Sequence, residues 1–147
     1  MNTVLGERPK TPWHLWVIGI VSLLWNSAGA ASYSMTELGM LDGMDIPPDQ
    51  LEFFANFPAW AVATWALGVW GCFFGSIALL LRSRWAVLLF GVSIVGLIGT
   101  TAYQRLVTEL PASMQGTGND VFSAAIWVIT IALFIYANRM RRAGVLR

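Results

Sequence analysis

The chain has 147 residues, of which 56% are hydrophobic and only 12% are charged. Soluble domains carry about 25% charged residues, so this composition excludes an ordinary water-soluble globule. The formal net charge of +1 gives no bulk attraction to nucleic acid, and we expect no nucleic-acid partner. The length suits a single domain over residues 1–147.

Four stretches of the chain are long and apolar enough to cross a membrane, which takes about 20 residues of helix. They contain no Asp, Glu, Lys or Arg and cover residues 13–32, 58–81, 85–103 and 121–137. A helix satisfies its own backbone hydrogen bonds in lipid. The sequence therefore predicts an all-α membrane protein, an antiparallel bundle of four transmembrane helices.

The basic residues are sorted by position, and this sorting predicts the orientation. Eight of the nine Lys and Arg residues precede the first span, join the second to the third, or follow the fourth: Arg8, Lys10, Arg82, Arg84, Arg139, Arg141, Arg142 and Arg147. Loops rich in Lys and Arg stay in the cytoplasm. We therefore expect both termini in the cytoplasm of a bacterium, with the chain in its inner membrane. A cleaved signal peptide, with a site at Ala28-Gly29-Ala30, is the competing interpretation of the first span.

The first loop, residues 33–57, is acidic and has no basic residue. Its segment 47–52 predicts the start of a short helix, because Asp49 and Glu52 have the spacing of a capping box. We expect this helix to lie in the head-group layer on the periplasmic side of the inner membrane. The alternative is an irregular loop. Asn56 is the expected cap of the second span, and Asn119 or Asp120 that of the fourth.

Few residues of the kinds that carry chemistry occur in the spans. The chain has one His, His14, and one Cys, Cys72, so neither a paired thiol nor a haem or metal site is indicated. No ionisable Asp, Glu, Lys or Arg lies within a span, where such a residue usually marks function. We expect a protein that is not an enzyme and that has no cofactor, no metal and no catalytic residue.

Neutral polar and small residues recur at helical spacing in all four spans. They form either the inner seam of the bundle, where small residues let helices approach, or the lining of a narrow polar cavity. The candidates for this seam or cavity are Asn26, Tyr33, Thr64, Thr100, Tyr103 and Gln104. Gly68, Gly71 and Gly75 form a helix-packing face, either within the chain or between copies. Trp65 and Trp70 lie deeper in the second span, where they pack or contact a ligand.

Two stretches carry a resemblance. Leu24-Trp25-Asn26-Ser27-Ala28-Gly29 is the first, and the second runs from Phe57-Pro58-Ala59-Trp60 through Gly68-Val69-Trp70-Gly71 to Arg82-Ser83-Arg84-Trp85. Together they resemble a family of small four-helix bacterial inner-membrane proteins, some of which are labelled "sugar transporter". The resemblance covers the first three spans and brings no catalytic residues with it.

Two functions follow as hypotheses. The first is a non-catalytic accessory or interaction subunit of a membrane complex, which contacts lipid and either another membrane protein or further copies of itself. It would dock through its small-residue faces and its acidic loop. The alternative is a transporter of small solutes that acts as an oligomer. The family label suggests sugars as these solutes.

Overall fold

The computed structural model describes residues 8–147, and this part of the chain consists of helices and connecting loops. The helices are α1 (Trp13–Glu37), α2 (Pro48–Ala55), α3 (Ala59–Leu80), α4 (Trp85–Ala102) and α5 (Thr117–Arg142). A π-helical turn, η1 (Tyr103–Val107), continues α4, and a 3-10 turn, η2 (Ala112–Met114), lies in the last loop. Four helices, α1, α3, α4 with η1, and α5, are long and apolar enough to cross a membrane. The prediction of an all-helical chain with four such segments is confirmed.

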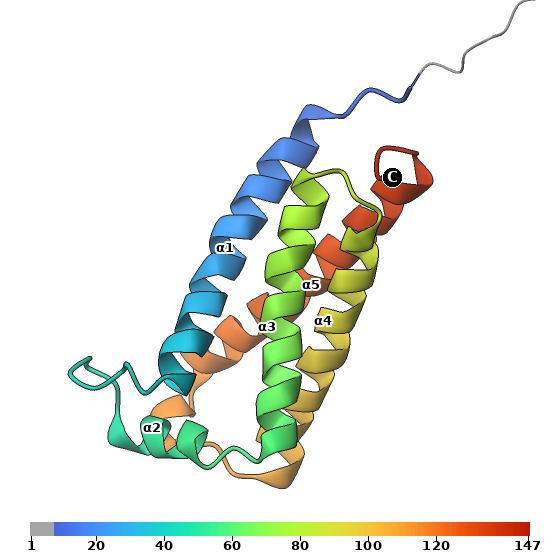
Figure 1. Ribbon diagram of the computed structural model, residues 1–147. Coiled ribbons are helices and arrows are strands. Elements are labelled where there is room, and N and C mark those ends of the chain that lie inside the picture. Colours follow the sequence, from blue (N-terminus) through green and yellow to red (C-terminus); the bar gives the residue numbers. More distant parts are fainter. Residues whose placement is uncertain (1–7) are drawn as a thin grey trace, which may run out of the picture.

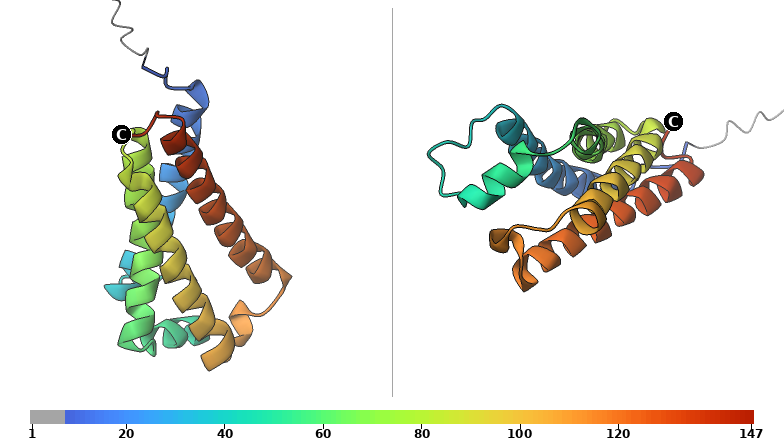
Figure 2. Two further views of the ribbon diagram at one scale, coloured as in Figure 1. Left: turned by 90° about the vertical axis from the view of Figure 1, so that its right-hand side faces the viewer. Right: turned by 90° about the horizontal axis from the view of Figure 1, so that it is seen from below.

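The four long helices do not pack evenly along their length. α1, α3 and α4 lie side by side, and α5 crosses behind them (Figure 1). Figure 2 shows that α5 meets the others near the C-terminus and diverges from α4 toward the opposite end. We call the end that holds the C-terminus and the α3–α4 turn the terminal end, and the end that holds α2 and η2 the loop end. The group of helices is therefore closed at the terminal end and wider at the loop end.

Small residues bring α3 and α4 into backbone contact. A Cβ atom added at Gly71 would lie 2.9 Å from the Leu89 carbonyl oxygen of α4, and one at Gly75 would lie 2.8 Å from the Phe90 ring. The Ser93 hydroxyl donates a hydrogen bond of 2.5 Å to the Gly68 carbonyl oxygen across the same contact. Such close approach is the usual role of small residues between helices in lipid. The predicted glycine face thus packs within the chain.

An apolar core fills the terminal end. Leu15, Leu79 and Phe90 are fully buried there, and Leu133 of α5 packs against them. The last residues of the chain close this core, because Leu146 is buried in it and the backbone of Arg147 is paired with the α3–α4 turn. The Arg84 N–H donates to the Arg147 carbonyl oxygen at 2.7 Å.

The ends of three helices differ from the expected caps. The residue before α2 is Pro47, which makes no side-chain cap bond, so the predicted capping box of Asp49 and Glu52 is wrong. Asn56 ends α2 instead of starting the next helix, whose N-cap is Pro58. α5 begins one turn early, after Gly116, and places Asn119 and Asp120 inside the helix. The turn of the chain decides which residue is the N-cap. A polar residue near a turn can end one helix or begin the next, so its presence alone does not locate the cap.

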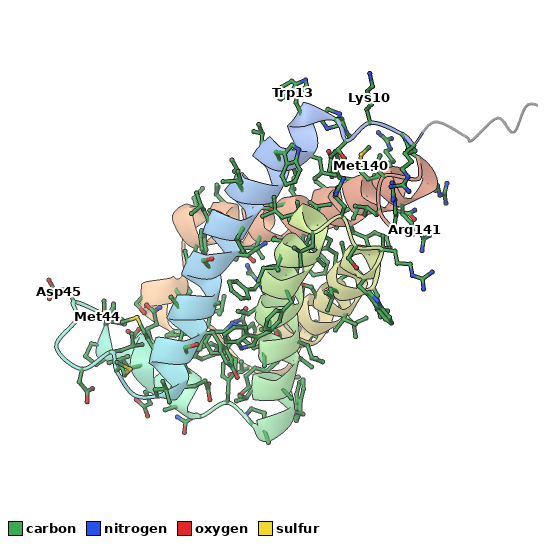
Figure 3. The ribbon with its side chains drawn as sticks, turned by 45° about the horizontal axis from the view of Figure 1, so that its top comes forward. Lys10, Trp13, Met44, Asp45, Met140 and Arg141 are labelled. Carbon is green, nitrogen blue, oxygen red and sulfur yellow. The ribbon has the colours of Figure 1, made fainter. Side chains whose placement is uncertain are left out.

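The charged residues are divided between the two ends. Lys10 and Arg141 lie at the terminal end, whereas Asp45 lies at the tip of the loop before α2 (Figure 3). The acidic residues of the described chain all belong to the loop-end segments: Glu37, Asp42, Asp45, Asp49, Glu52, Glu109 and Asp120. Between the ends, large apolar side chains are exposed, among them Leu24, Val95 and Val128 at 62–68%.

Candidate functional site: a polar cavity at the loop end

A cavity of about 460 Å³ lies among the helices on the loop-end side. All five helices contribute to its lining, together with η1, η2 and the loops between them. Residues of α4 and α5 both belong to the lining, on the side where these two helices diverge (Figure 2). Its volume falls within the range of small-molecule sites, which is about 300–1,000 Å³.

A belt of neutral polar side chains forms the inner end of the cavity. The Asn26 amide of α1 donates to the Ser76 hydroxyl of α3 at 2.9 Å and to the Cys72 carbonyl oxygen at 3.3 Å. The Cys72 thiol lies 3.0 Å from the Ser93 hydroxyl of α4 and 3.7 Å from the Thr130 hydroxyl of α5. All five side chains are at least 92% buried. The belt therefore links all four long helices at mid-length.

The side-chain carbonyl of Asn26 has a different role from its amide group. Both hydrogen bonds of this side chain are donated by Nδ2, and among residues 8–147 no group donates to Oδ1. Asn26 also lines the cavity. Among residues 8–147 no fully buried side-chain oxygen or nitrogen lacks a partner, so Oδ1 keeps some accessible surface and can accept a hydrogen bond from an occupant of the cavity.

Aromatic side chains make up part of the cavity wall and cover it at the loop end. Trp25 of α1 contacts Phe122 of α5 at a ring-centroid distance of 6.0 Å, across the gap between these helices. Phe54 of α2 stacks on Trp65 of α3, with centroids 5.0 Å apart. Because Gln50 and Leu51 also reach the lining, α2 acts as the cover of the cavity.

The lining carries almost no net charge. Arg105 of η1 is the single residue of the lining with a formally charged side chain, and it forms an ion pair of 2.7 Å with Asp120 of α5. Both side chains are exposed, at 44% and 59%, so this ion pair lies at the surface of the protein. The other polar residues of the lining are Asn26, Ser32, Thr36, Gln50, Cys72, Ser93, Thr100, Thr101, Gln104, Asn119, Ser123 and Thr130. Such a lining matches an uncharged solute with hydroxyl groups.

Three of the six residues predicted for a seam or cavity line the cavity: Asn26, Thr100 and Gln104. The other three are packed at helix contacts. Tyr33 lies against Trp65 at 4.8 Å, and Tyr103 against Phe57 at 4.8 Å. The Thr64 hydroxyl lies 3.4 Å from that of Thr100 in the α3–α4 contact.

The two deeper tryptophans have separate surroundings. Trp65 lies in the cavity wall, whereas Trp70 packs with Phe73 and Phe74 of its own helix and is outside the lining.

Sequence reasoning missed several residues of the lining. Asn119 lies one turn before Ser123 and two residues after the start of α5, so extending the polar stripe of this helix backward would have found it. Gln50 and Phe54 come from α2, and no periodicity within the spans indicates that this short helix covers the cavity.

Asp49 connects the cover to the last loop. One oxygen of its carboxylate accepts the Gln50 N–H at 3.0 Å, and the other accepts the Ser113 N–H at 3.1 Å. The bond from Ser113 is the main reason that the pKa of Asp49 lies below its ordinary value. Since the charged form is favoured, this connection is complete above the ordinary pKa, near pH 4, and is lost as the pH falls through the lowered value.

We expect Asp49→Ala to free the α2 cover without unfolding the chain. The Ser113 amide of this variant should exchange faster with deuterium at pH 7 than that of the wild type. In the wild type, the protection of this amide relative to its intrinsic exchange rate should fall when the pH is brought below the lowered pKa of Asp49. Asp45→Ala is the matched control, because this exposed carboxylate makes no hydrogen bond with residues 8–147. Equal exchange in both variants would contradict the role of Asp49.

Comparison with protein-family models, with curated proteins and with solved structures finds no match to this chain. The resemblance to small bacterial inner-membrane proteins therefore stays a prediction.

Proposed function

We propose that the chain is a multi-pass membrane protein that binds a small, uncharged, hydroxylated solute in the loop-end cavity. The observation that carries this proposal is the polar belt at the inner end of the cavity, with the Asn26 carbonyl lacking a donor among residues 8–147. A polar cavity of this size within apolar helices costs free energy unless its groups are satisfied by water or by a ligand.

The proposed setting is the bacterial inner membrane, which the chain crosses as an antiparallel bundle of four spans. In this setting α2 lies in the head-group layer on the periplasmic side. Four long apolar helices and their exposed apolar side chains support embedding. The separation of basic and acidic residues supports the orientation, because Arg and Lys favour the cytoplasmic side. In this orientation both termini are cytoplasmic, and the cavity lies on the periplasmic side of the membrane.

The chemistry of the lining narrows the class of solute. A charged ligand would lack a counter-charge, since the one charged side chain of the lining is already paired with Asp120. A sugar or polyol offers several hydroxyl donors and acceptors to amides and hydroxyls, and its apolar face can stack on an aromatic ring. Trp25 and Trp65 supply such rings. This class agrees with the family label that the sequence resemblance suggests.

The cavity also bears on transport. The apolar core at the terminal end closes the path on that side, and α2 covers the cavity at the loop end. A carrier would have to separate the helices at the core, and we propose that it does so as an oligomer. In the accessory-subunit hypothesis, the docking surfaces were the small-residue faces and the acidic loop. α4 covers the glycine face of α3, so the support for docking is reduced to the acidic loop. Solute binding is therefore the better supported function.

The test is binding of neutral sugars and polyols to the protein purified in mild detergent, with Asn26→Leu as the variant. Leu has a similar size and removes the carbonyl, so the affinity of a bound solute should fall at least about tenfold. Asn138→Leu is the matched control, because this amide lies near the terminal end and outside the lining. A panel without any binder, or an Asn26→Leu variant with wild-type affinity, would reject the proposal.

A further inference from the structure

A second hollow, unconnected with the cavity, lies on the outer face between α4 and α5. This groove has a volume of about 620 Å³ and shares no lining residue with the cavity. Apolar residues line most of it, including Gly91 and Val95 of α4 and Phe134 of α5. Arg84 and Arg141 line its terminal end. We propose that the groove binds one anionic phospholipid, with its phosphate at the two arginines and an acyl chain along α4.

The charges of the groove favour an anionic head group. Neither Arg84 nor Arg141 has a carboxylate partner among residues 8–147, where the one ion pair is that of Arg105 and Asp120. The Arg141 guanidinium donates to the Asn138 side-chain oxygen at 2.8 Å, which leaves its other N–H groups free. Guanidinium groups bind phosphate oxygens in pairs of parallel hydrogen bonds. The N-terminus of α4, at Trp85, adds a partial positive charge at the same end.

The length of the groove fits an acyl chain in one leaflet. Eleven residues separate Arg84 from Val95, which at about 1.5 Å per residue is about 16 Å. Half of a hydrocarbon core of about 30 Å is about 15 Å. The arginines therefore lie at head-group level when Val95 lies near the middle of the bilayer. Trp85, which is 59% exposed, then lies at the membrane surface, where tryptophan is enriched.

Gly91 keeps the groove open. A Cβ atom at this position would meet the Phe134 ring at 3.6 Å, an ordinary contact, and no other atom within 4 Å. A larger side chain there would fill the groove without striking the backbone. This inference rests on the proposed membrane embedding but is independent of solute binding in the cavity.

The experiment is native mass spectrometry of the detergent-purified full chain with phosphatidylglycerol and, separately, with phosphatidylcholine. The wild type should retain phosphatidylglycerol preferentially. Arg84→Gln with Arg141→Gln should lower that affinity about thirtyfold, since each arginine contributes about fivefold near anionic lipid. Gly91→Leu should weaken it while the charges remain.

The control is Arg139→Gln with Arg142→Gln, which removes the same charge from the end of α5 outside the groove. An equal loss in this control would mean a diffuse basic surface and would overturn the site. Full retention by Gly91→Leu, or displacement of the lipid by inorganic phosphate, would overturn it as well. A chain that stays dissolved without detergent would overturn the membrane embedding itself, and lack of solute binding would leave the lipid result unaffected.

Discussion

Gly96→Ala is expected to destabilise the fold more than any other single methyl group added to this chain. The new Cβ atom would clash with the backbone of α3, at the Gly68 nitrogen and the Thr64 oxygen, and would lie 2.9 Å from the Leu67 carbonyl carbon. Backbone atoms inside a helix cannot move aside as a flexible side chain does. The two helices must separate, and the Ser93 bond to the Gly68 carbonyl oxygen is lost with their contact.

The expected cost is about 3 kcal/mol or more, the upper part of the range for overpacked cores. At about 2–4 °C per kcal/mol for a chain of this size, the unfolding midpoint in detergent should fall by roughly 10 °C. Tryptophan fluorescence on heating, with size-exclusion chromatography, measures this change.

Gly29→Ala and Gly118→Ala are the controls for Gly96→Ala, because a Cβ atom at either position meets nothing within 4 Å. Alanine is also the better helix former by about 0.5–1 kcal/mol. Both controls should fold at least as well as the wild type. If Gly96→Ala melted together with them, α3 and α4 would not approach as closely as the structure has them.

The spacing of the small residues predicted that a packing face exists, but not what it packs against. Gly68, Gly71 and Gly75 repeat at helical spacing, and such a face serves equally for a second copy or for another helix of the chain. Which of the two packs against this face depends on the glycines of the opposing helix and on the turn that joins the two helices. Residues 81–84 form so short a connection that α3 and α4 must pack against each other.

The polar belt was predictable in part, for a similar reason. Asn26 and Thr100 were found because a polar side chain amid apolar residues must find partners. Tyr33 lies two turns from Asn26 and was grouped with it, yet it is turned to the contact with Trp65. Helical spacing tells which residues share a face, but the crossing of α5 and the position of α2 decide which part of the face stays open.

Gly29→Trp tests the cavity itself and should abolish solute binding with the fold intact. Gly29 lines the cavity in α1, between Trp25 and Ser32, and a Cβ atom there meets no atom within 4 Å. An indole at this position therefore has room to enter a cavity of about 460 Å³, and it would take the space that a solute needs. Gly29→Ala adds a methyl group to the same wall and should keep wild-type affinity.

A second measurement on Gly29→Trp does not depend on the identity of the solute. Cys72 is the single cysteine of the chain. It is 95% buried and lines the inner end of the cavity, so we expect a small, uncharged methanethiosulfonate reagent to reach its thiol slowly and by way of the cavity. The indole should slow this reaction severalfold, whereas Gly29→Ala should leave the rate unchanged. Equal rates in all three proteins would mean that access to Cys72 does not pass Gly29, and the cavity would then not be the route by which a solute reaches Asn26.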